Sequence, residues 1–247
     1  MDLTDKIALV TGAGSGLGAA AALTLAEAGA DLILVSRTKS ELDKVARQAR
    51  LKGRDALVFP ADTADDKQMR LLFAAIKKQF GHLDFVFANA GVNGVWAPIE
   101  QLKPKEWDDT IRNNLRGTYL TVHLAVPLMK KCGGSIVITS SINGTRTFTS
   151  AGASAYSTTK AGQLSLGQML ALELAKYRIR VNVICPGAID SEISDNTKKR
   201  DTGKAKVPAQ FPKGTVPLTD GVPGQAQDVA DLVLFLASDQ SKHVTGT

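Results

Sequence analysis

The chain has 247 residues, of which 44% are hydrophobic and 22% are charged. That length and balance favour one globular domain with a large core and argue against a disordered or fibrous chain. The net charge of +6 raises the question of nucleic-acid binding, but the sequence has no basic helix with interleaved aromatic residues and no zinc-finger spacing. We therefore expect no nucleic-acid partner and no metal site.

The cysteines and the first residues bear on the cellular compartment. Cys132 and Cys185 match no metal or redox spacing, so we expect two buried small hydrophobic side chains in a reducing compartment. The segment Met1–Lys6 lacks the apolar region of a signal peptide, and no apolar run is long enough to cross a membrane. We expect a cytoplasmic protein with no membrane partner.

Strand-like and helix-like segments alternate along the chain. The expected strands are Ile7–Val10, Asp31–Ser36, Ala56–Phe59, Leu83–Ala88, Ser135–Thr139 and Arg180–Cys185. The expected helices are a first one that ends near Gly29, then Lys39–Leu51, Asp66–Phe80, Trp107–Lys131, Tyr156–Tyr177 and Asp228–Ser238. A further strand is expected after the last helix, which leaves open a truncated C-terminus.

This alternation predicts the fold class. Continuous apolar strands between helices indicate an α/β protein with a single parallel sheet that helices cover on both faces. Right-handed crossovers make such a sheet doubly wound, as in a Rossmann fold. We expect residues 1–247 to form one dinucleotide-binding domain that also carries the catalytic residues.

The stretch Thr11–Gly18, TGAGSGLG, joins the first strand to the first helix. Glycine accepts positive φ and lets phosphates approach the backbone, and a helix N-terminus favours an anion. The spacing T-G-x3-G-x-G fits better than the general dinucleotide fingerprint, because Leu17 stands where that pattern needs glycine or alanine. The alternative is a glycine-rich turn without a ligand. The candidate cofactor-binding residues in this turn are Thr11, Gly12, Ser15, Gly16, Leu17 and Gly18.

Small and polar residues follow each of the other expected strands. In an open parallel sheet, ligands bind beyond the carboxyl ends of the strands. These residues therefore predict a nucleotide cleft along that edge of the sheet. The candidates are Ser36, Arg37 and Thr38 after the second strand, Asp62 and Thr63 after the third, Asn89, Ala90 and Gly91 after the fourth, and Pro186 and Gly187 after the sixth.

The end of the second strand bears on the choice of cofactor. NAD sites usually place an Asp or Glu there to bind the ribose 2′-hydroxyl, whereas this chain has Ser36 and Arg37. An arginine fork suits a 2′-phosphate, and Thr38 and Lys39 add a hydroxyl and a second charge. Stacking of Arg37 on adenine in an NAD site is the alternative. We expect NADP(H) to be favoured over NAD(H).

Tyr156 and Lys160 are four residues apart on an expected helix and so share a face. A tyrosine has a pKa of about 10, and a neighbouring ammonium group favours the phenolate and lowers that pKa. Ser140 and Ser141 end the preceding strand, where a hydroxyl could orient a carbonyl oxygen. Asn114 lies within an expected helix, either on a solvated face or buried with a water near Lys160. Two unrelated surface residues remain the alternative for the Tyr–Lys pair.

Taken in order, these motifs resemble those of the short-chain dehydrogenase/reductase family over essentially the whole chain, with 3-oxoacyl carrier-protein reductases among the similar members. Asn89–Gly91 matches a family motif, here preceded by Ala88 where the family often has another Asn. The turn Pro186–Gly187 matches the family turn beneath the nicotinamide. The resemblance implies a catalytic tetrad of Asn114, Ser141, Tyr156 and Lys160.

The resemblance also implies the roles of these residues. Tyr156 would donate a proton to the carbonyl oxygen while hydride comes from the nicotinamide. Lys160 would lower the pKa of the tyrosine and bind the nicotinamide ribose. Ser141 would orient the carbonyl, and Asn114 would hold a water that links Lys160 to solvent. Ile189 and Ser191 stand where the family contacts the nicotinamide carboxamide.

One departure from the family concerns spacing. Ser141 and Tyr156 are further apart than is usual in the family, so we interpret Arg146–Ser154 as a slightly longer loop. Ser140 is the less favoured candidate for the orienting hydroxyl, and Asn143, at the common spacing, could share that role.

Residues 192–225 are rich in Pro, Gly, Lys and Thr without clear periodicity, which is typical of a lid over a substrate site. Its basic residues could attract an anionic substrate or an acyl carrier, or could form a solvated loop. These cations are Lys198, Lys199, Arg200, Lys204 and Lys206. The physiological substrate and direction stay open.

We predict an NADP-dependent reductase of a ketone or an aldehyde. One alternative is a polyol or sugar dehydrogenase that works toward oxidation, and another is a non-catalytic dinucleotide-binding regulator. The helix Tyr156–Tyr177 is apolar on more than one side, which indicates a subunit contact. Its apolar residues include Leu164, Leu166, Met169, Leu170, Leu172 and Leu174. The family resemblance points to a homotetramer, with a homodimer as the smaller option.

Overall fold

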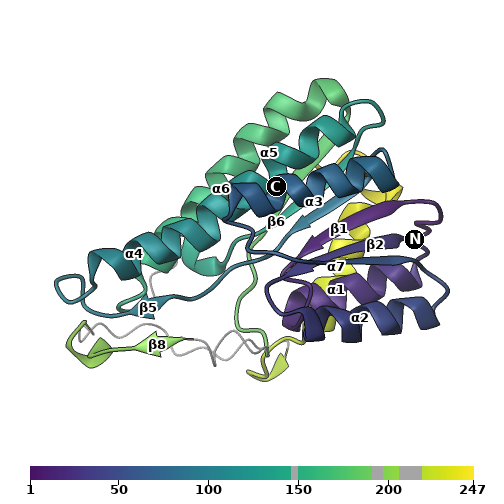
Figure 1. Cartoon of the computed structure of the whole chain (residues 1–247). Coiled ribbons are helices and arrows are strands. Elements are labelled where there is room, and N and C mark those ends of the chain that lie inside the picture. The colour runs from purple at the N-terminus through teal and green to yellow at the C-terminus, as the bar shows by residue number, and fades with distance from the viewer. Residues whose placement is uncertain (146–149, 191–196, 206–218) are drawn as a thin grey trace.

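The computed structural model describes residues 1–145, 150–190, 197–205 and 219–247. Its centre is a six-stranded parallel sheet with the strand order β3-β2-β1-β4-β6-β7 (Figure 1). The strands are β1 (Ile7–Thr11), β2 (Asp31–Ser36), β3 (Ala56–Pro60), β4 (Phe85–Ala88), β6 (Gly134–Thr139) and β7 (Ile179–Ile184). The winding reverses between β1 and β4, which confirms the predicted doubly wound Rossmann-type sheet.

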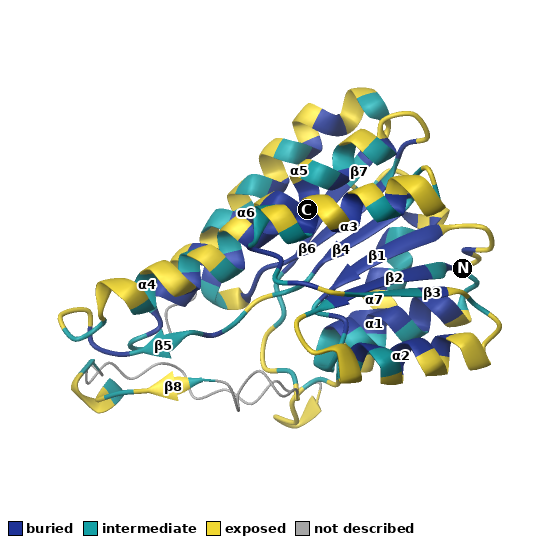
Figure 2. Cartoon of the chain, in the orientation of Figure 1, coloured by how far each residue is buried: buried dark blue, intermediate teal, exposed yellow. Residues whose placement is uncertain are grey.

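Helices cover both faces of the sheet (Figure 1). One face carries α1 (Gly16–Glu27), α2 (Lys39–Leu51) and α7 (Ala226–Ala237), and the other carries α3 (Asp66–Gln79), α5 (Gly117–Met129) and α6 (Ser154–Leu174). Successive strand residues point to opposite faces, so the apolar runs in the strands supply both layers at once. Figure 2 shows the result, with buried strands and helices that are striped by exposure.

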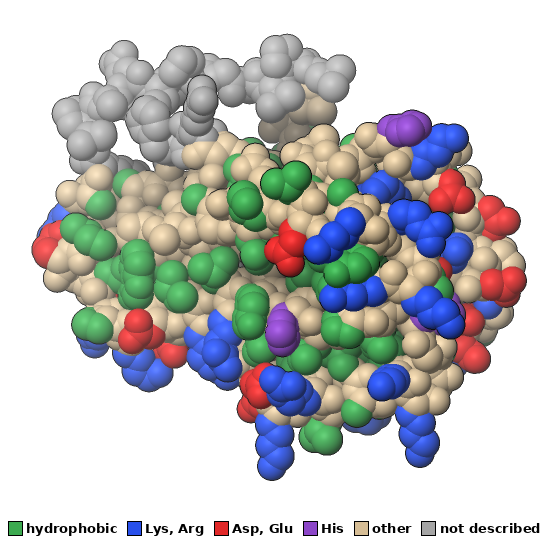
Figure 3. Space-filling model, turned by 90° about the horizontal axis from the view of Figure 1, so that it is seen from above, with side chains coloured by type: hydrophobic (Ala, Val, Ile, Leu, Met, Phe, Trp, Pro, Cys, Tyr) green, Lys and Arg blue, Asp and Glu red, His purple; other side chains and the backbone are tan. Residues whose placement is uncertain are grey.

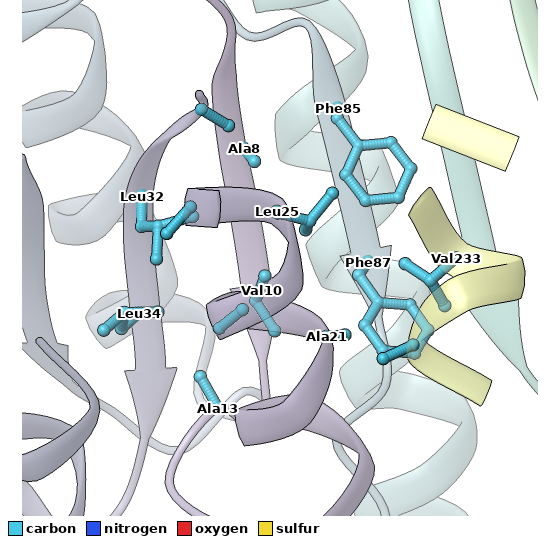
Figure 4. Packing of buried hydrophobic residues seen from close by; sticks show 14 of the residues in the cluster. Ala8, Val10, Ala13, Ala21, Leu25, Leu32, Leu34, Phe85, Phe87 and Val233 are labelled. Atoms are coloured by element: carbon cyan, nitrogen blue, oxygen red, sulfur yellow. The ribbon is translucent and has the colours of Figure 1, made fainter. Parts of the chain in front are cut away.

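The core between the sheet and α1, α7 is seen in Figure 4. Phe85 and Phe87 extend from β4 towards Leu25 of α1 and Val233 of α7. All four side chains are buried, and Phe87 is among the largest that are fully buried. This packing explains why α7 joins the layer although it lies far along the chain from α1.

The expected helix Trp107–Lys131 is wrong as a single element. The structure has α4 (Pro104–Ile111), a π-helical turn η1 (Arg112–Arg116) and then α5. A π turn places one extra residue in the helix, often at a functional site. Periodicity alone favoured one continuous helix, because an insertion of this kind leaves the apolar pattern on both sides intact.

A second sheet of two parallel strands lies beside α4. In it β5 (Val95–Trp96) pairs with β8 (Lys198–Lys199). The expected lid, residues 192–225, is described only over 197–205 and 219–225. Residues 191–196 and 206–218 lie outside the described part, as do residues 146–149 of the expected longer loop. The lid over residues 192–225 therefore stays a prediction.

The chain end and the cysteines differ from expectation. Past α7, no strand is assigned in the described residues, but the Gly246 amide donates to the Val181 carbonyl (2.8 Å) and the Val183 amide to Thr247 (2.9 Å). The expectation of two buried cysteines is wrong, because Cys132 is exposed in the turn before β6 and Cys185 is half-buried after β7. None of the helices among the described residues is both long and apolar enough to span a membrane.

Candidate active site

The carboxyl ends of the strands open into one cavity of about 770 Å³. Most residues predicted to bind the cofactor line it, and so does Ser141 of the predicted tetrad. Those cofactor candidates are Gly12, Ser15, Gly16, Leu17, Ser36, Arg37, Thr38, Asp62, Thr63, Asn89, Ala90, Gly91, Tyr156, Lys160, Pro186, Gly187 and Ile189. Thr11 and Gly18 are buried and do not line the cavity, and Ser191 lies outside the described residues.

The glycine turn forms a close-packed cradle at the start of α1. Gly12 and Gly16 adopt φ of +66° and +50°, which side chains rarely tolerate. A Cβ on Gly18 would lie 2.0 Å from the carbonyl oxygen of Gly12, so the helix can begin here only with glycine at this position. No side chain caps the first turn of α1, whose N-terminus faces the cavity through Gly16 and Leu17. These features fit a pyrophosphate bound at a helix N-terminus.

Thr11 joins the ends of β1 and β4. Its hydroxyl accepts hydrogen bonds from the amides of Asn89 (3.0 Å) and Ala90 (3.1 Å). The Asn89 side chain donates in turn to the Thr11 carbonyl (3.2 Å) and accepts from the Thr139 hydroxyl of β6 (3.1 Å). Thr11 thus supports the floor of the cavity from below. The glycine motif alone could not distinguish this position from one in direct contact with a ligand.

The end of the cavity next to β2 and β3 carries charges of both signs. Arg37 is exposed at the end of β2, and Glu41 of α2 lines the same wall. Asp62 forms an ion pair with Arg112 (2.8 Å). Burial raises the pKa of Asp62, but hydrogen bonds from the Ala64 amide and from Arg112 outweigh burial and hold it below the usual value. The sequence analysis did not predict Glu41, because it lies in the first turn of α2 and not directly after β2.

Tyr156 and Ser141 meet at the other end of the cavity. Ser141 follows β6 and accepts a hydrogen bond from the Asn143 amide (3.2 Å), while its side chain lies near enough to the phenol of Tyr156 to act on the pKa of that group. The Ser140 hydroxyl instead donates to the Lys160 carbonyl (2.7 Å). This geometry favours Ser141 over Ser140 as the orienting hydroxyl and gives Asn143 a backbone contact to it.

Lys160 is buried one helical turn beyond Tyr156. Lys160 is 3% exposed, and its Nζ donates a hydrogen bond to the Thr139 carbonyl (2.8 Å). The same Nζ lies 5.6 Å from the centre of the Tyr156 ring. Burial disfavours the charged form, so it lowers the pKa of Lys160 to about 7.

The expected lowering of the Tyr156 pKa by Lys160 is not what the structure shows. Burial raises the pKa of Tyr156, and the hydrogen bond with Ser141 lowers it only in part. Desolvation wins because the phenol is nearly enclosed, and because burial lowers the pKa of the lysine beside it to about 7, so that its ammonium form is only partly populated at neutral pH. A phenol that keeps its proton is the form needed by a proton donor.

Asn114 is fully buried in the π turn, which excludes the solvated alternative. Its side chain accepts from the Val92 amide (2.7 Å) and donates to the Val92 carbonyl (2.8 Å) and to Thr159 (3.0 Å). Its carbonyl accepts from Thr118 (2.7 Å) and from Gln163 (3.0 Å). Asn114 therefore braces the loop after β4 against α6. Its predicted water stays a prediction.

Comparison with known proteins bears on this arrangement. A family model described as enoyl-(acyl carrier protein) reductase matches residues 12–247. The chain belongs to the short-chain dehydrogenase/reductase family. It is 33% identical over 251 residues to the 3-oxoacyl-(acyl-carrier-protein) reductase of Thermotoga maritima, a match that covers 100% of this chain and 96% of that protein.

Solved structures of the family are similar throughout. The crystal structure of a 3-ketoacyl-ACP reductase from Sinorhizobium meliloti superposes with a TM-score of 0.92 at 55% identity, and covers 97% of this chain and 94% of its own. The structure of an NAD⁺-bound xylitol dehydrogenase has a TM-score of 0.87 at 28% identity, and covers 100% and 97%. Family membership makes this chain an oxidoreductase of the dehydrogenase/reductase type.

The burial of Lys160 predicts a pH-dependent cost to stability. In the unfolded chain a lysine binds its proton up to about pH 10.4, whereas in the fold this one releases it near pH 7. Between these values the unfolded state binds more protons, so stability rises with pH. The stability advantage of Lys160→Met over the wild type should therefore shrink as pH rises from about 7 to 10, by up to about 1.4 kcal/mol per pH unit.

Chemical denaturation of the cofactor-free protein over this pH range measures the effect. Lys44→Met on the exposed surface of α2 is the matched control and should differ from the wild type by a constant amount. A Lys160→Met difference that does not change with pH would mean that Lys160 keeps its proton in the fold.

Proposed function

We propose that this protein is an NADP-dependent reductase that converts a ketone or an aldehyde to an alcohol. The observation that supports this function is a single cavity lined by both the glycine cradle and Tyr156, Lys160 and Ser141. A non-catalytic regulator would need only the cradle. When bound, the nicotinamide dinucleotide supplies hydride to the carbonyl carbon.

The residues of the chain supply the proton and the orientation. The Ser141 hydroxyl, which lines the cavity beside the phenol, holds the carbonyl oxygen beside Tyr156. Tyr156 then donates its proton to that oxygen as negative charge develops on it, which completes the alcohol. Lys160 lies close to the ring, and its protonated form stabilises the resulting phenolate. The raised pKa of Tyr156 favours reduction at neutral pH over polyol oxidation, which needs the phenolate first.

Replacement of Tyr156 by Phe tests the proton donor. Tyr156→Phe should lower kcat for carbonyl reduction by roughly 10²- to 10⁴-fold and leave dinucleotide binding nearly intact, because only the hydroxyl is lost. The assay follows NADPH oxidation with a 3-oxoacyl thioester, a diketone, a keto sugar and an aromatic ketone. Tyr177→Phe is the control, since this half-buried tyrosine lies at the end of α6 and does not line the cavity. Undiminished turnover by Tyr156→Phe would refute the assignment.

The choice of NADP rests on Arg37, with Glu41 acting against it. Both side chains line the cavity beside Ser36 and Thr38. A guanidinium fork suits a 2′-phosphate, whereas a carboxylate on the same wall repels it. Lys39, also expected to help, forms an ion pair with Asp43 (2.7 Å) and does not line the cavity.

This balance predicts opposite shifts in cofactor preference. Arg37→Gln should lower kcat/KM for NADPH roughly 10-fold or more with little change for NADH, because a charged hydrogen bond is lost. Glu41→Gln should raise the NADPH-to-NADH ratio, and Lys39→Gln should leave it unchanged. Preference for NADH by the wild type would contradict the proposal.

We also propose that the protein self-associates, as a tetramer or a dimer, through the face that carries α5 and α6. Met169 and Leu172 of α6 are 59% and 76% exposed, and Tyr119 of α5 is 48% exposed. Figure 3 shows hydrophobic side chains among basic ones on this side of the molecule. Exposed apolar side chains gathered on one face are typical of a subunit contact.

Sedimentation at micromolar concentration tests this contact. Leu172→Glu should weaken assembly on the order of 10-fold or more, because a carboxylate would be buried at the interface. Leu51→Glu, at a leucine that is 83% exposed on α2, should leave assembly unchanged. A monomeric wild type would end the proposal.

A further inference from the structure

The short sheet of β5 and β8 brings the segment after residue 196 to the catalytic end of the cavity. Val95 pairs with Lys198, and Trp96 pairs with Lys199. Paired residues of parallel strands point to the same face, and both Val95 and Lys198 line the cavity. Trp96 lies 6.3 Å from Tyr156 between ring centres, so this sheet stands beside the proton donor.

Several contacts fix the backbone around Lys198. The Arg200 amide donates to the Trp96 carbonyl (2.9 Å), and the Asn93 side chain donates to Thr197 (2.6 Å). The Arg200 guanidinium holds both carboxylate oxygens of Glu106 on α4 at 2.8 Å, and it also donates to the carbonyl of Gln101. This ion pair lowers the pKa of Glu106 to about 2, so the anchor persists through neutral pH.

The contacts of the cations within 197–205 distinguish Lys198 from the other cations of the expected lid. Arg200 is held by Glu106, and Lys204 by Asp201 (2.9 Å). The Nζ of Lys199 lies over the ring of Trp96, 5.5 Å from its centre. Among the cations within 197–205, Lys198 is the one that lines the cavity, and the residue is exposed.

The charges that line the cavity are divided between its two ends. Glu41 of α2 and Asp62 after β3 lie on the β2–β3 side of the sheet, away from Tyr156. At the catalytic end, the charged side chains that line the described wall are those of Lys160 and Lys198. Lys160 is directed to the Thr139 carbonyl, so Lys198 is the cation placed to meet a ligand there. Val92 and Val95 give this end an apolar wall.

We propose that Lys198 binds an anionic group, a carboxylate or a phosphate, carried by the carbonyl substrate. This inference rests on the proposed reductase function and names the class of its substrate. An ammonium on a flexible stem acts as a point charge and accepts either group. The two valines accommodate the apolar portion that joins the carbonyl to the anion.

Matched substrates test the contact. Lys198→Gln should lower kcat/KM for a 3-oxo carboxylate about 10-fold or more, mainly through KM, and leave its methyl ester unaffected. Lys204→Gln, which removes the same charge from the same segment, should not discriminate between acid and ester. A 3-oxoacyl-CoA and its N-acetylcysteamine analogue, which lacks phosphates, form a second pair. An effect confined to this second pair supports the inference and identifies the anion as phosphate.

Each remaining outcome has a distinct meaning. If the wild type reduces the neutral ester and thioester but Lys198→Gln changes every substrate equally, the inference is overturned and the reductase function stands. If Lys198→Gln weakens NADPH binding without distinguishing substrates, Lys198 serves the cofactor and the inference is likewise overturned. If the wild type reduces no carbonyl compound in either pair or in the wider panel, the proposed function itself fails.

Discussion

A parallel sheet that is buried on both faces leaves polar side chains one place to act, beyond the carboxyl ends of its strands. The apolar residues of β1, β2, β4 and β6 fill two cores, so the polar residues of these strands that line the cavity, Ser36 and Thr139, are the last residues of β2 and β6. At the strand ends, Thr11, Asn89 and Thr139 join β1, β4 and β6 through hydrogen bonds of 3.0–3.2 Å. These hydrogen bonds fix the floor of the cavity, on which the glycine turn and the proposed catalytic side chains are placed.

Burial of Lys160 is the main cost that this arrangement imposes. The Lys160 ammonium group donates to the neutral Thr139 carbonyl, and such a contact compensates poorly for the water that the group has lost. The loop after β4 approaches it closely, since a Cβ on Gly91 would lie 3.2 Å from Asn114 Oδ1 and 3.6 Å from Lys160 Nζ. A buried lysine with a strongly lowered pKa in a cleft is typical of a functional site.

The helical segment before α5 connects the two walls of the catalytic end. In the π turn, Asn114 holds Val92, and on the preceding α4, Glu106 holds Arg200 and with it β8. The adjoining α4 and π turn therefore position both the loop beside Lys160 and the strand that carries Lys198. The π turn that follows α4 places Asn114 inward, between the loop after β4 and α6.

The sequence by itself determined the succession of strands and helices along the chain, the glycine turn and the pairing of Tyr156 with Lys160. These depend on local propensity and on residues a few positions apart, and the structure confirms the parallel sheet that they imply. The tertiary structure decided that Thr11 lies beneath the cavity, that Glu41 and Lys198 line it, and that burial raises the pKa of Tyr156. Desolvation and contacts such as Arg200 with Glu106 join residues distant in the chain, and no local pattern encodes how much water a side chain loses.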